Sequence, residues 1–360
     1  MSTETVARFT VPFTRYLDRD GAASSPLPKW VDDPVGLVAM YRAMIRTRTF
    51  DAKAVSLQRT GRLGTFASSL GQEAVGVGTA AAMDATDILV PSFRDQAAQL
   101  WRGVKPLELL LYWGGDERGS DFSIPREDFP ICVPVASHAT HAVGVALSMK
   151  LRGERKATVC MVGDGATSKG DFHEALVMAG IWRVPLVMLI ANNQWAISMP
   201  RAAQNAAQTL AQGAIAAGIP GEQVDGNDVI AVHDRVRAAL DHARGGGGPT
   251  VIEAVTYRLT DHTTSDDAGR YRAAAEVSEH WHDEPIVRLR RFLTARGVWT
   301  RDDEENALAS TAAEMDSTTE QYLATKVQPA AALFDFLFAT LPAPLSAQRA
   351  HAIAEEAGDA

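Results

Sequence analysis

The sequence predicts an α/β protein built on a doubly wound, mostly parallel sheet, with an N-terminal arm and a helical C-terminal region. Short apolar runs rich in β-branched residues recur along the chain, which is typical of strands buried on both faces of such a sheet. Helical patterns separate these runs between about residues 87 and 257, and this alternation favours parallel strands. The runs lie at residues 88–91, 131–135, 158–162, 186–191 and 250–257.

The N-terminal arm covers residues 1–34, where four prolines prevent a long helix. Asp32 or Asp33 can cap the helix that begins at the last of these prolines. This helix keeps its apolar spacing until Gly61 ends it. A helix of small residues is then expected from about residue 72 to residue 83.

Polar and apolar stretches alternate before the centre of the chain. Residues 114–130 predict a polar surface loop near the site, residues 131–135 a buried strand, and residues 140–150 an alanine-rich helix. Beyond the centre, the sequence predicts a helix, a turn-rich stretch, a second helix and a polar loop. These lie at residues 205–217, 218–226, 229–243 and 260–269.

The central segment gives the clearest local signal. A strand at residues 158–162 ends at Gly163-Asp164-Gly165, and a second strand at residues 186–191 ends at Asn192-Asn193. Between them an apolar stripe with i, i+3, i+4, i+7 spacing indicates an amphipathic helix, formed by Phe172, Ala175, Leu176 and Ala179. The unit is βαβ, and such crossovers are nearly always right-handed.

The chain is mostly helical from residue 273 onwards. Two apolar stripes mark helices there, Ile286, Leu289, Phe292 and Leu293 in one, and Leu333, Phe334, Leu337 and Phe338 in the other. We therefore expect three parts, with an arm and first helix at residues 1–45, an α/β domain at 46–270 and a helical region at 271–360.

Composition narrows the class of protein. The chain has 360 residues, of which 46% are hydrophobic and 22% charged, and a net charge of −9, as expected for a globular protein. The acidic balance argues against nucleic acid or an anionic membrane as partner, and no apolar run approaches a membrane span. Cys132 and Cys160 lie in apolar runs, so buried free thiols and a cytoplasmic location are expected.

The two predicted strand ends of the βαβ unit carry residues that suit a metal-bridged diphosphate. Ligands bind at the carboxyl ends of parallel strands, where Asp164, Asn192 and Asn193 lie. Backbone N–H groups after Gly165 can hold an oxyanion, while a carboxylate with one or two amide oxygens suits Mg²⁺. Each motif alone is usually a turn or a cap, but 26 residues separate Gly165 from Asn192, which places both motifs in one unit.

Two cationic residues stand at other predicted strand ends. Arg94 could clamp a phosphate, against the alternative of a surface salt bridge with Asp95 or Asp51. His262 could bind phosphate or donate a proton to a developing oxyanion, against the alternative of a solvated loop histidine. Arg258 could support either the loop or the phosphate.

The other histidines point to no metal site. His138 and His141 are three residues apart, but no third ligand accompanies them, so packing or pocket-lining roles are expected. His280 and His282 flank a tryptophan near a helix start and are expected to be solvated.

The GDG and NN motifs resemble the metal-binding motif of thiamine-diphosphate enzymes. More specifically, the chain resembles the alpha subunit of 2-oxo acid dehydrogenases over about residues 40–290, in the family's order. The resemblance is carried by GRLGTFASSLGQEA, FRDQAAQLWRG, GDGATSKGDFHEA, NNQWAIS, VDGNDV and TYRLTDHTTSDDAGRYR followed by DEPI. It implies the pyrophosphate half of a thiamine-diphosphate-binding fold.

The resemblance also implies roles for individual residues. Mg²⁺ would be bound by Asp164, Asn193 and the backbone carbonyl of Trp195. The diphosphate would meet Gly165, Ala166, Arg94 and His262, and the rest of the cofactor would meet Val133 and Val135. Phe93 takes the place of the family's usual tyrosine, and His138 stands where relatives often carry glutamine.

In thiamine-diphosphate enzymes made of a single chain, the glutamate that activates the cofactor lies in a second α/β domain. The present chain has room for only one such domain. The resemblance therefore implies a beta subunit in an α₂β₂ heterotetramer that decarboxylates a 2-oxo acid and acylates the lipoyl groups of an acyltransferase core. Pyruvate is the first expected substrate and 3-methyl-2-oxobutanoate the second. The third alternative is that the chain belongs to an acetoin dehydrogenase. A nicotinamide enzyme is disfavoured because no G-x-G-x-x-G follows a strand, and an inactive scaffold because the site residues are intact.

Overall fold

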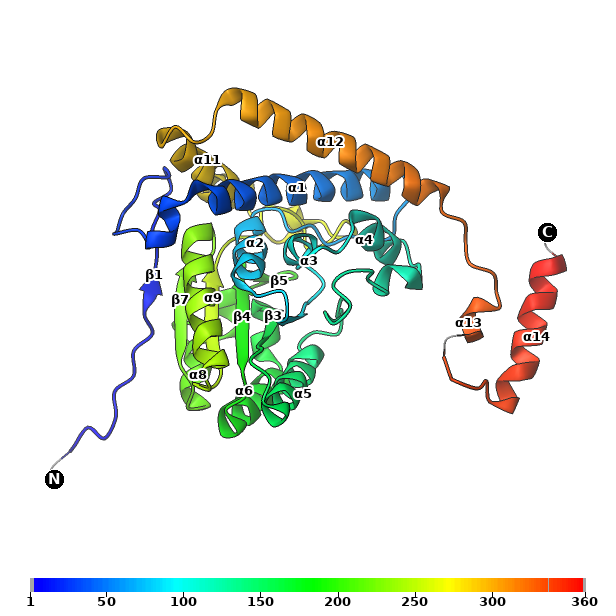
Figure 1. The fold of residues 1–360 in the computed structure, drawn as a ribbon, viewed down its shortest axis with the longest axis horizontal. Helices are drawn as coiled ribbons and strands as arrows, with labels where there is room; N and C mark the ends of the chain where they lie inside the picture. Colours follow the sequence, from blue (N-terminus) through cyan, green and yellow to red (C-terminus); the bar gives the residue numbers. More distant parts are fainter. Residues whose placement is uncertain (1–2, 336, 359–360) are drawn as a thin grey trace.

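A computed structural model describes residues 3–335 and 337–358. Its centre is a six-stranded sheet with the order β1-β7-β8-β4-β3-β2, and every neighbouring pair of strands is parallel (Figure 1). The strands are β1 (Phe13–Thr14), β2 (Ile88–Val90), β3 (Thr158–Gly163), β4 (Leu186–Asn192), β7 (Gly221–Asp225) and β8 (Thr250–Val255). A short antiparallel pair, β5 (Trp195–Ala196) and β6 (Met199–Pro200), follows β4. The predicted fold class is confirmed.

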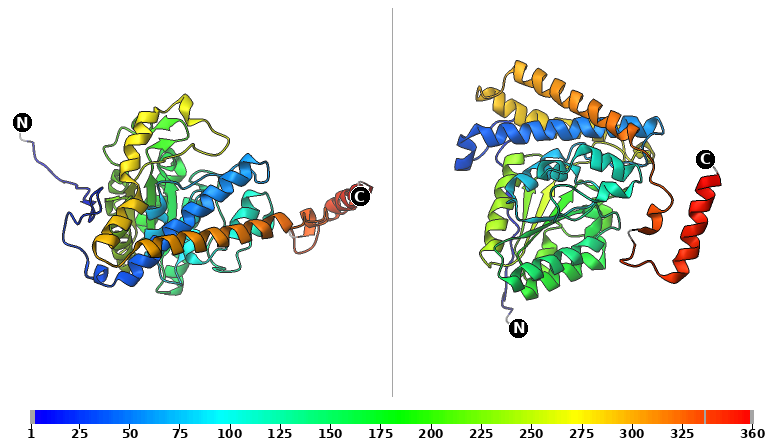
Figure 2. Two further views of the ribbon diagram at one scale, coloured as in Figure 1. Left: turned by 90° about the horizontal axis from the view of Figure 1, so that it is seen from above. Right: turned by 45° about the vertical axis from the view of Figure 1, so that its right-hand side comes forward.

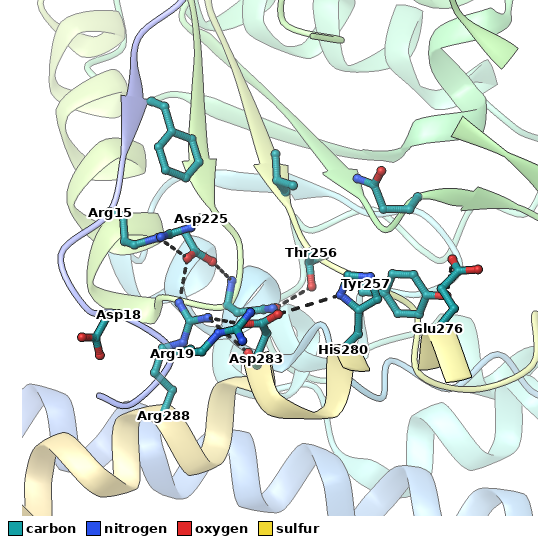
Figure 3. Close-up of a pocket in the computed structure, with 14 residues that line it drawn as sticks. Arg15, Asp18, Arg19, Asp225, Thr256, Tyr257, Glu276, His280, Asp283 and Arg288 are labelled. Atoms are coloured by element: carbon teal, nitrogen blue, oxygen red, sulfur yellow. Dashed lines mark hydrogen bonds and ion pairs between the residues drawn. The ribbon is translucent and has the colours of Figure 1, made fainter. Parts of the chain in front are cut away.

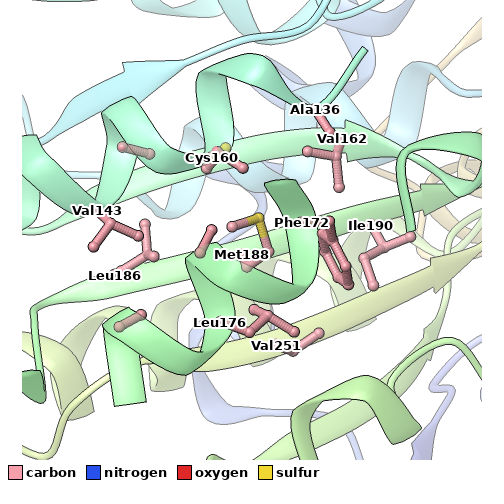
Figure 4. Packing of buried hydrophobic residues seen from close by; sticks show 14 of the residues in the cluster. Ala136, Val143, Cys160, Val162, Phe172, Leu176, Leu186, Met188, Ile190 and Val251 are labelled. Atoms are coloured by element: carbon pink, nitrogen blue, oxygen red, sulfur yellow. The ribbon is translucent and has the colours of Figure 1, made fainter. Parts of the chain in front are cut away.

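The apolar strand sequences are explained by burial on both faces of the sheet. Along β3, Cys160 and Val162 pack under α5 (Ser137–Arg152) and α6 (Gly170–Trp182), as Figure 4 shows. The alternate residues Val159 and Met161 belong to a second apolar core on the opposite face. The helices α2 (Glu73–Ala82) and α9 (Val229–Arg244) contribute to that second core.

Long helices form a further layer outside α2. The 26-residue helix α1 (Pro34–Arg59) runs across it, and α11 (Pro285–Ala295) and α12 (Arg301–Ala324) lie along α1 (Figures 1 and 2). Asp33 caps α1 by accepting a hydrogen bond from Val35 N, as the sequence predicts. The shorter helices α3 (Gln96–Arg102) and α4 (Pro106–Trp113) pack against this layer, α3 on α1 and α2 and α4 on α12.

The C-terminal segment extends away from the sheet (Figures 1 and 2). It contains α13 (Ala332–Asp335) and α14 (Ala343–Gly358). The helix predicted from the stripe Leu333, Phe334, Leu337 and Phe338 is wrong in extent. It ends at Asp335, Phe338 is not helical, and Phe336 lies outside the described residues.

Two stretches predicted to be irregular contain strands. Within the N-terminal arm, β1 adds to the edge of the sheet beside β7, so residues 1–34 are not irregular throughout. The turn-rich stretch at 218–226 contains β7 itself, whose polar residues and glycine conceal a strand. Both strands form because the sheet supplies hydrogen-bond partners that local sequence does not reveal.

Two predicted elements are absent from the described structure. Residues 131–135 make only a single bridge, between Cys132 and Ser92, because Pro130 and Pro134 cannot donate to a ladder. Cys132 is therefore only half-buried, whereas Cys160 is buried as expected. The helix predicted at 205–217 forms only in part, as α8 (Gln212–Ala216), while α7 (Arg201–Gln204) precedes the predicted range.

The break between α7 and α8 has a local cause. The Asn205 side chain accepts a hydrogen bond from Ala207 N, and the Gln212 side chain accepts one from Thr209 N. Such side-chain bonds compete with the helical pattern. The segment at 114–130 is mostly exposed, as predicted, but Asp128 within it is buried, where it accepts a hydrogen bond from Leu89 N and pairs with Arg102.

The described residues contain no helix with the length and apolar character needed to span a membrane.

Candidate active site

The candidate site residues follow four neighbouring strands in the order β8-β4-β3-β2. Asp164 follows β3, Asn193 follows β4, Arg94 lies beyond β2, and His262 lies in the loop after β8. Gly163 pairs in register with Ala191, so Asp164 and Asn193 leave the sheet at the same edge. The residues at these strand ends therefore lie at one edge of the sheet, as predicted.

Of the two asparagines, only Asn193 has an amide oxygen with a lone pair left for a cation. Asn192 donates from Nδ2 to Glu253 over 2.7 Å, and its Oδ1 accepts from the backbone and side chain of Gln194. Asn193 donates from Nδ2 to Gln72, while its Oδ1 accepts one long bond, 3.3 Å from Trp195 N. The site thus offers one amide oxygen.

Asp164 begins the short 3₁₀ helix η3 (Asp164–Ser168) and is only 3% exposed. Burial raises its pKa to about 6. The side-chain donor found for it among the described residues is the Gln204 amide, with Nε2 3.4 Å from Oδ2, which is longer than a normal hydrogen bond. Backbone N–H groups of Gly165 and of Asp164 itself also stabilise the carboxylate, but no cationic side chain pairs with it among the described residues, which fits a bound cation.

The third predicted ligand is the carbonyl of Trp195, at the start of β5. Arg258 donates to this oxygen over 3.2 Å, which leaves its second lone pair available. Among residues 3–335 and 337–358, no cluster of three or more acidic, histidine or cysteine side chains could hold a metal alone. One carboxylate with neutral oxygens suits Mg²⁺ that is completed by phosphate oxygens.

The two glycines of the GDG motif serve different purposes. A Cβ on Gly165 would lie 2.7 Å from the Cβ of Ala196, so Gly165 is needed for η3 to pack against β5. A Cβ on Gly163 would meet no atom within 4 Å, so the backbone there borders open space. A ligand can approach Gly163 closely.

Arg94 is buried, and its observed hydrogen-bond partners are neutral. One terminal nitrogen donates to Ser68 O over 2.5 Å and the other to His262 O over 2.8 Å. The alternative of a surface salt bridge is therefore wrong. Burial and the nearby Arg258 lower the pKa of Arg94 to about 10.

Arg258 is fully buried beside Arg94, and its partners are also neutral. It donates to three backbone carbonyls and to the hydroxyl of Tyr271, whose pKa is raised to about 12 by burial. Burial lowers the pKa of Arg258 as well. Carboxylates lie near both arginines, but neither guanidinium pairs directly with one among the described residues, an arrangement that suits a bound anion.

His262 is held between the two arginines. Arg94 and Arg258 each place a terminal nitrogen 3.2 Å from His262 Nδ1. Because both nitrogens are donors, Nδ1 accepts and the ring proton is on Nε2. Burial and then the two arginines lower the pKa of His262 to about 4, so the ring is neutral at pH 7.

The Phe93 ring packs against His262 and Arg94. Its ring meets His262 edge-on with centroids 5.8 Å apart, and the Arg94 guanidinium lies 5.4 Å from the ring centroid.

Val133 and Val135 are 52% and 46% exposed, in the segment that leads into α5. Ala166 is buried within η3.

The remaining histidines differ in their surroundings. His138 is buried, with Nε2 2.8 Å from Met161 O, as a packing role predicts, whereas His141 is exposed. His280 is not solvated as predicted, because its ring stacks on Tyr257 with centroids 3.8 Å apart. His282 is exposed.

A cavity of about 530 Å³ lies beside the site, next to Gln194 (Figure 3). Its walls are joined by ion pairs. Asp225 pairs with Arg15 and Arg288, and Arg19 pairs with Asp283 (Figure 3). These charges tie the N-terminal arm to the end of β7 and to α11.

Sequence reasoning missed two residues that contact the predicted ligands. Gln72 bonds Asn193, and Gln204 lies near Asp164. The available signal for Gln72 was its place in the GQEA motif, and Gln204 had no signal. Arg258 was noted, but its burial beside Arg94 could not be inferred from spacing.

Comparison with known proteins identifies the family of the chain. The family model described as "Dehydrogenase E1 component" matches residues 41–331. The chain is 43% identical over 270 residues to the 3-methyl-2-oxobutanoate dehydrogenase subunit alpha of Mycobacterium tuberculosis, covering 75% of this chain and 74% of that one. It is 35% identical over 348 residues to the pyruvate dehydrogenase E1 component subunit alpha of Staphylococcus epidermidis, covering 96% and 93%. The Staphylococcus aureus counterpart is 36% identical over 313 residues, covering 87% and 85%. The chain therefore belongs to the dehydrogenase E1 component family.

Proposed function

We propose that this chain is the alpha subunit of a thiamine-diphosphate-dependent 2-oxo acid dehydrogenase. One observation carries the proposal. Two buried arginines with neutral partners, Arg94 and Arg258, lie at the strand ends that also present Asp164 and Asn193. Two guanidinium groups without a direct carboxylate partner, together with a separate set of oxygen ligands, suit a diphosphate bridged by a cation.

Mg²⁺ would be held by Asp164, Asn193 and the Trp195 carbonyl. The donor set is made of hard oxygens, as this ion prefers. The diphosphate would lie along the backbone at Gly165 and Ala166. Thiamine diphosphate, when bound, supplies the electron sink for decarboxylation of a 2-oxo acid.

The chain's own residues bind and orient the cofactor. Arg94 would donate to diphosphate oxygens, while Arg258 fixes the Trp195 carbonyl and the loop after β8. His262 donates from Nε2–H, because Nδ1 is occupied by the arginines. Since its pKa is about 4, it acts at neutral pH as a hydrogen-bond donor rather than as an imidazolium acid.

A beta subunit completes the site in this proposal. The segment that would meet the thiamine end of the cofactor is open, with Val133 and Val135 about half exposed, and Ile197 and Met199 on the β5–β6 turn are exposed as well. Exposed apolar side chains around a polar site are typical of an interaction surface. We infer an α₂β₂ heterotetramer that serves a lipoyl acyltransferase core.

Two substrates are proposed. Pyruvate is the first. It is supported by the segments GRLGTFASSLGQEA and QTLAQGAIAAGIPGEQVDG and by a pyruvate dehydrogenase relative that aligns with nearly the whole chain. The second is 3-methyl-2-oxobutanoate, and the 43% identity to the mycobacterial subunit favours it. Both are 2-oxo acids, so the chemistry proposed for the residues of this chain is the same for either substrate.

The experiment is a steady-state comparison of the assembled α/β pair with the two acids at equal concentrations, followed by lipoyl acylation. A higher kcat/KM for pyruvate supports the first substrate, and a higher value for the branched acid removes it in favour of the second. Turnover of neither acid in the presence of Mg²⁺ and thiamine diphosphate contradicts the proposed activity.

A further inference from the structure

We propose that Gln72 is a positioning residue for the cation site, where its side-chain carbonyl holds the Asn193 amide so that Oδ1 faces the metal. The inference rests on the proposed function, because it takes Asn193 as a ligand. Gln72 lies on a different segment from the predicted ligands, at the N-cap of α2.

The contact is direct and buried. Asn193 Nδ2 donates to Gln72 Oε1 over 3.1 Å, and both side chains are buried. An asparagine can bind a cation only through its oxygen, since the NH₂ group has no lone pair to offer. With Nδ2 turned toward Gln72, the oxygen is directed to the other side of the amide.

A second contact prevents the reversed orientation. Trp195 N lies 3.3 Å from Asn193 Oδ1 and donates to it. If the amide were flipped, its NH₂ group would face this N–H donor, while its oxygen would face Gln72 Oε1. Both contacts would then oppose like groups, so the two neighbours together select one orientation.

The position of Gln72 is itself fixed by the end of β8. Thr256 donates from its hydroxyl to Gly71 O over 2.9 Å, and Gly71 has a φ of +92°. A Cβ on Gly71 would lie 2.7 Å from Tyr257 O. Gln72 therefore cannot shift without moving residues that lead into the loop carrying His262.

A structural role alone does not explain a glutamine here. Gln72 Nε2 is buried without a hydrogen-bond partner in the described chain. The cost of this unsatisfied amide nitrogen, about 1–3 kcal/mol, accompanies the contact between Gln72 Oε1 and Asn193 Nδ2, which a side chain without a carbonyl cannot make. The carbonyl end is the part of the side chain that has a function.

The test replaces the carbonyl while keeping the shape of the side chain. In the full chain assembled with its beta subunit, Gln72→Met removes the acceptor and Gln72→Glu keeps it. Mn²⁺ serves as the probe, with its dissociation constant and bound spectrum measured by electron paramagnetic resonance. We expect Gln72→Met to weaken Mn²⁺ binding about tenfold or more and Gln72→Glu to stay within about threefold of the unmodified protein.

Gln99→Met is the matched control, because Gln99 is also buried and its side chain has no partner among the described residues. It should leave Mn²⁺ binding unchanged, and the Tm of Gln72→Met should stay close to that of the control. Unchanged Mn²⁺ affinity in Gln72→Met, or equal losses in the Met and Glu variants, overturns the positioning role. Asp164→Ala and Asn193→Ala run alongside, and if these also bind Mn²⁺ normally, the proposed cation site itself is wrong.

Discussion

The pair of arginines at the candidate site determines the protonation state of the residue between them. His262 receives hydrogen bonds from Arg94 and Arg258 at the same ring nitrogen. Burial disfavours the charged ring, and the two neighbouring positive charges add to this effect. The neutral ring is therefore a consequence of its neighbours, and its free Nε2–H is directed by them.

The titration of His262 tests this arrangement. Its folded-state pKa, about 4, is below the usual value of 6.5, so the unfolded chain binds more protons between these values. The contribution of His262 to stability is thus fully present above about pH 6.5 and is lost as the pH falls toward 4. We expect its ring signals in NMR to show no titration between pH 8 and pH 5.5. Titration of His262 near pH 6.5 would contradict the contact with both arginines.

Arg94→Met should weaken cofactor binding while it leaves the stability of the cofactor-free chain almost unchanged. The variant removes a charge-assisted contact to the diphosphate, and we expect weaker cofactor binding by about 1.5–3 kcal/mol. The variant also removes a buried charge without an ionic partner, so the unfolding free energy of the cofactor-free chain should change by less than about 1 kcal/mol. Calorimetric binding and urea unfolding measure the two quantities. Loss of stability without loss of affinity would assign Arg94 a purely structural role.

At the scale of elements, sequence patterns predicted those strands and helices whose signals are local. The unit β3–α6–β4 was found because both strands are apolar on each face and the helix has a regular stripe. The strand β7 was missed because its sequence, GEQVD, has the composition of a turn. The strand predicted at 131–135 does not form, because its prolines interrupt pairing despite the apolar side chains. Pairing with neighbouring strands therefore decided the outcome for β7, and prolines decided it for residues 131–135.

The end of α6 carries a strain that substitution can remove. Arg183 is the C-cap, with a left-handed φ of 46°, and is exposed. Glycine adopts this conformation without steric cost, so Arg183→Gly should stabilise the protein by about 0.5–1 kcal/mol. Arg152→Gly in the last turn of α5 is the control and should destabilise by about 1 kcal/mol, because that residue is helical. Urea unfolding checks both values, and a loss of stability in Arg183→Gly would contradict the expected relief.

The whole molecule is organised so that distant segments meet at one edge of the sheet. The strand order could be anticipated only in outline, but strand ends in a parallel sheet share an edge, which is why Asp164, Asn193, Arg94 and His262 were predicted together. The contacts of Gln72 and Arg258 could not be predicted, because they depend on loop paths rather than on spacing. The thiamine end of the cofactor also depends on a second chain in our proposal.

Asp228 joins the N-terminal arm to the sheet domain. Its buried carboxylate caps α9 by accepting from Ile230 N and Ala231 N, and it also accepts from Tyr16 N and Leu17 N. We expect Asp228→Ala to destabilise the protein by about 2–4 kcal/mol, since four backbone donors lose their partner. Asp33→Ala, which removes only a helix cap, should cost about 1 kcal/mol. Equal losses of unfolding free energy in the two variants would show that the arm is not held by Asp228.

The central claim is that a divalent cation is held by Asp164 and Asn193 and carries the diphosphate of the cofactor. The most direct measurement is the Mg²⁺ dependence of thiamine diphosphate binding by the assembled α/β protein, compared with its Asp164→Ala variant. We predict that the unmodified protein binds the cofactor only with Mg²⁺ and that the variant loses this binding while keeping its assembly. If the variant binds thiamine diphosphate with unchanged affinity and unchanged Mg²⁺ dependence, the site is not the one described.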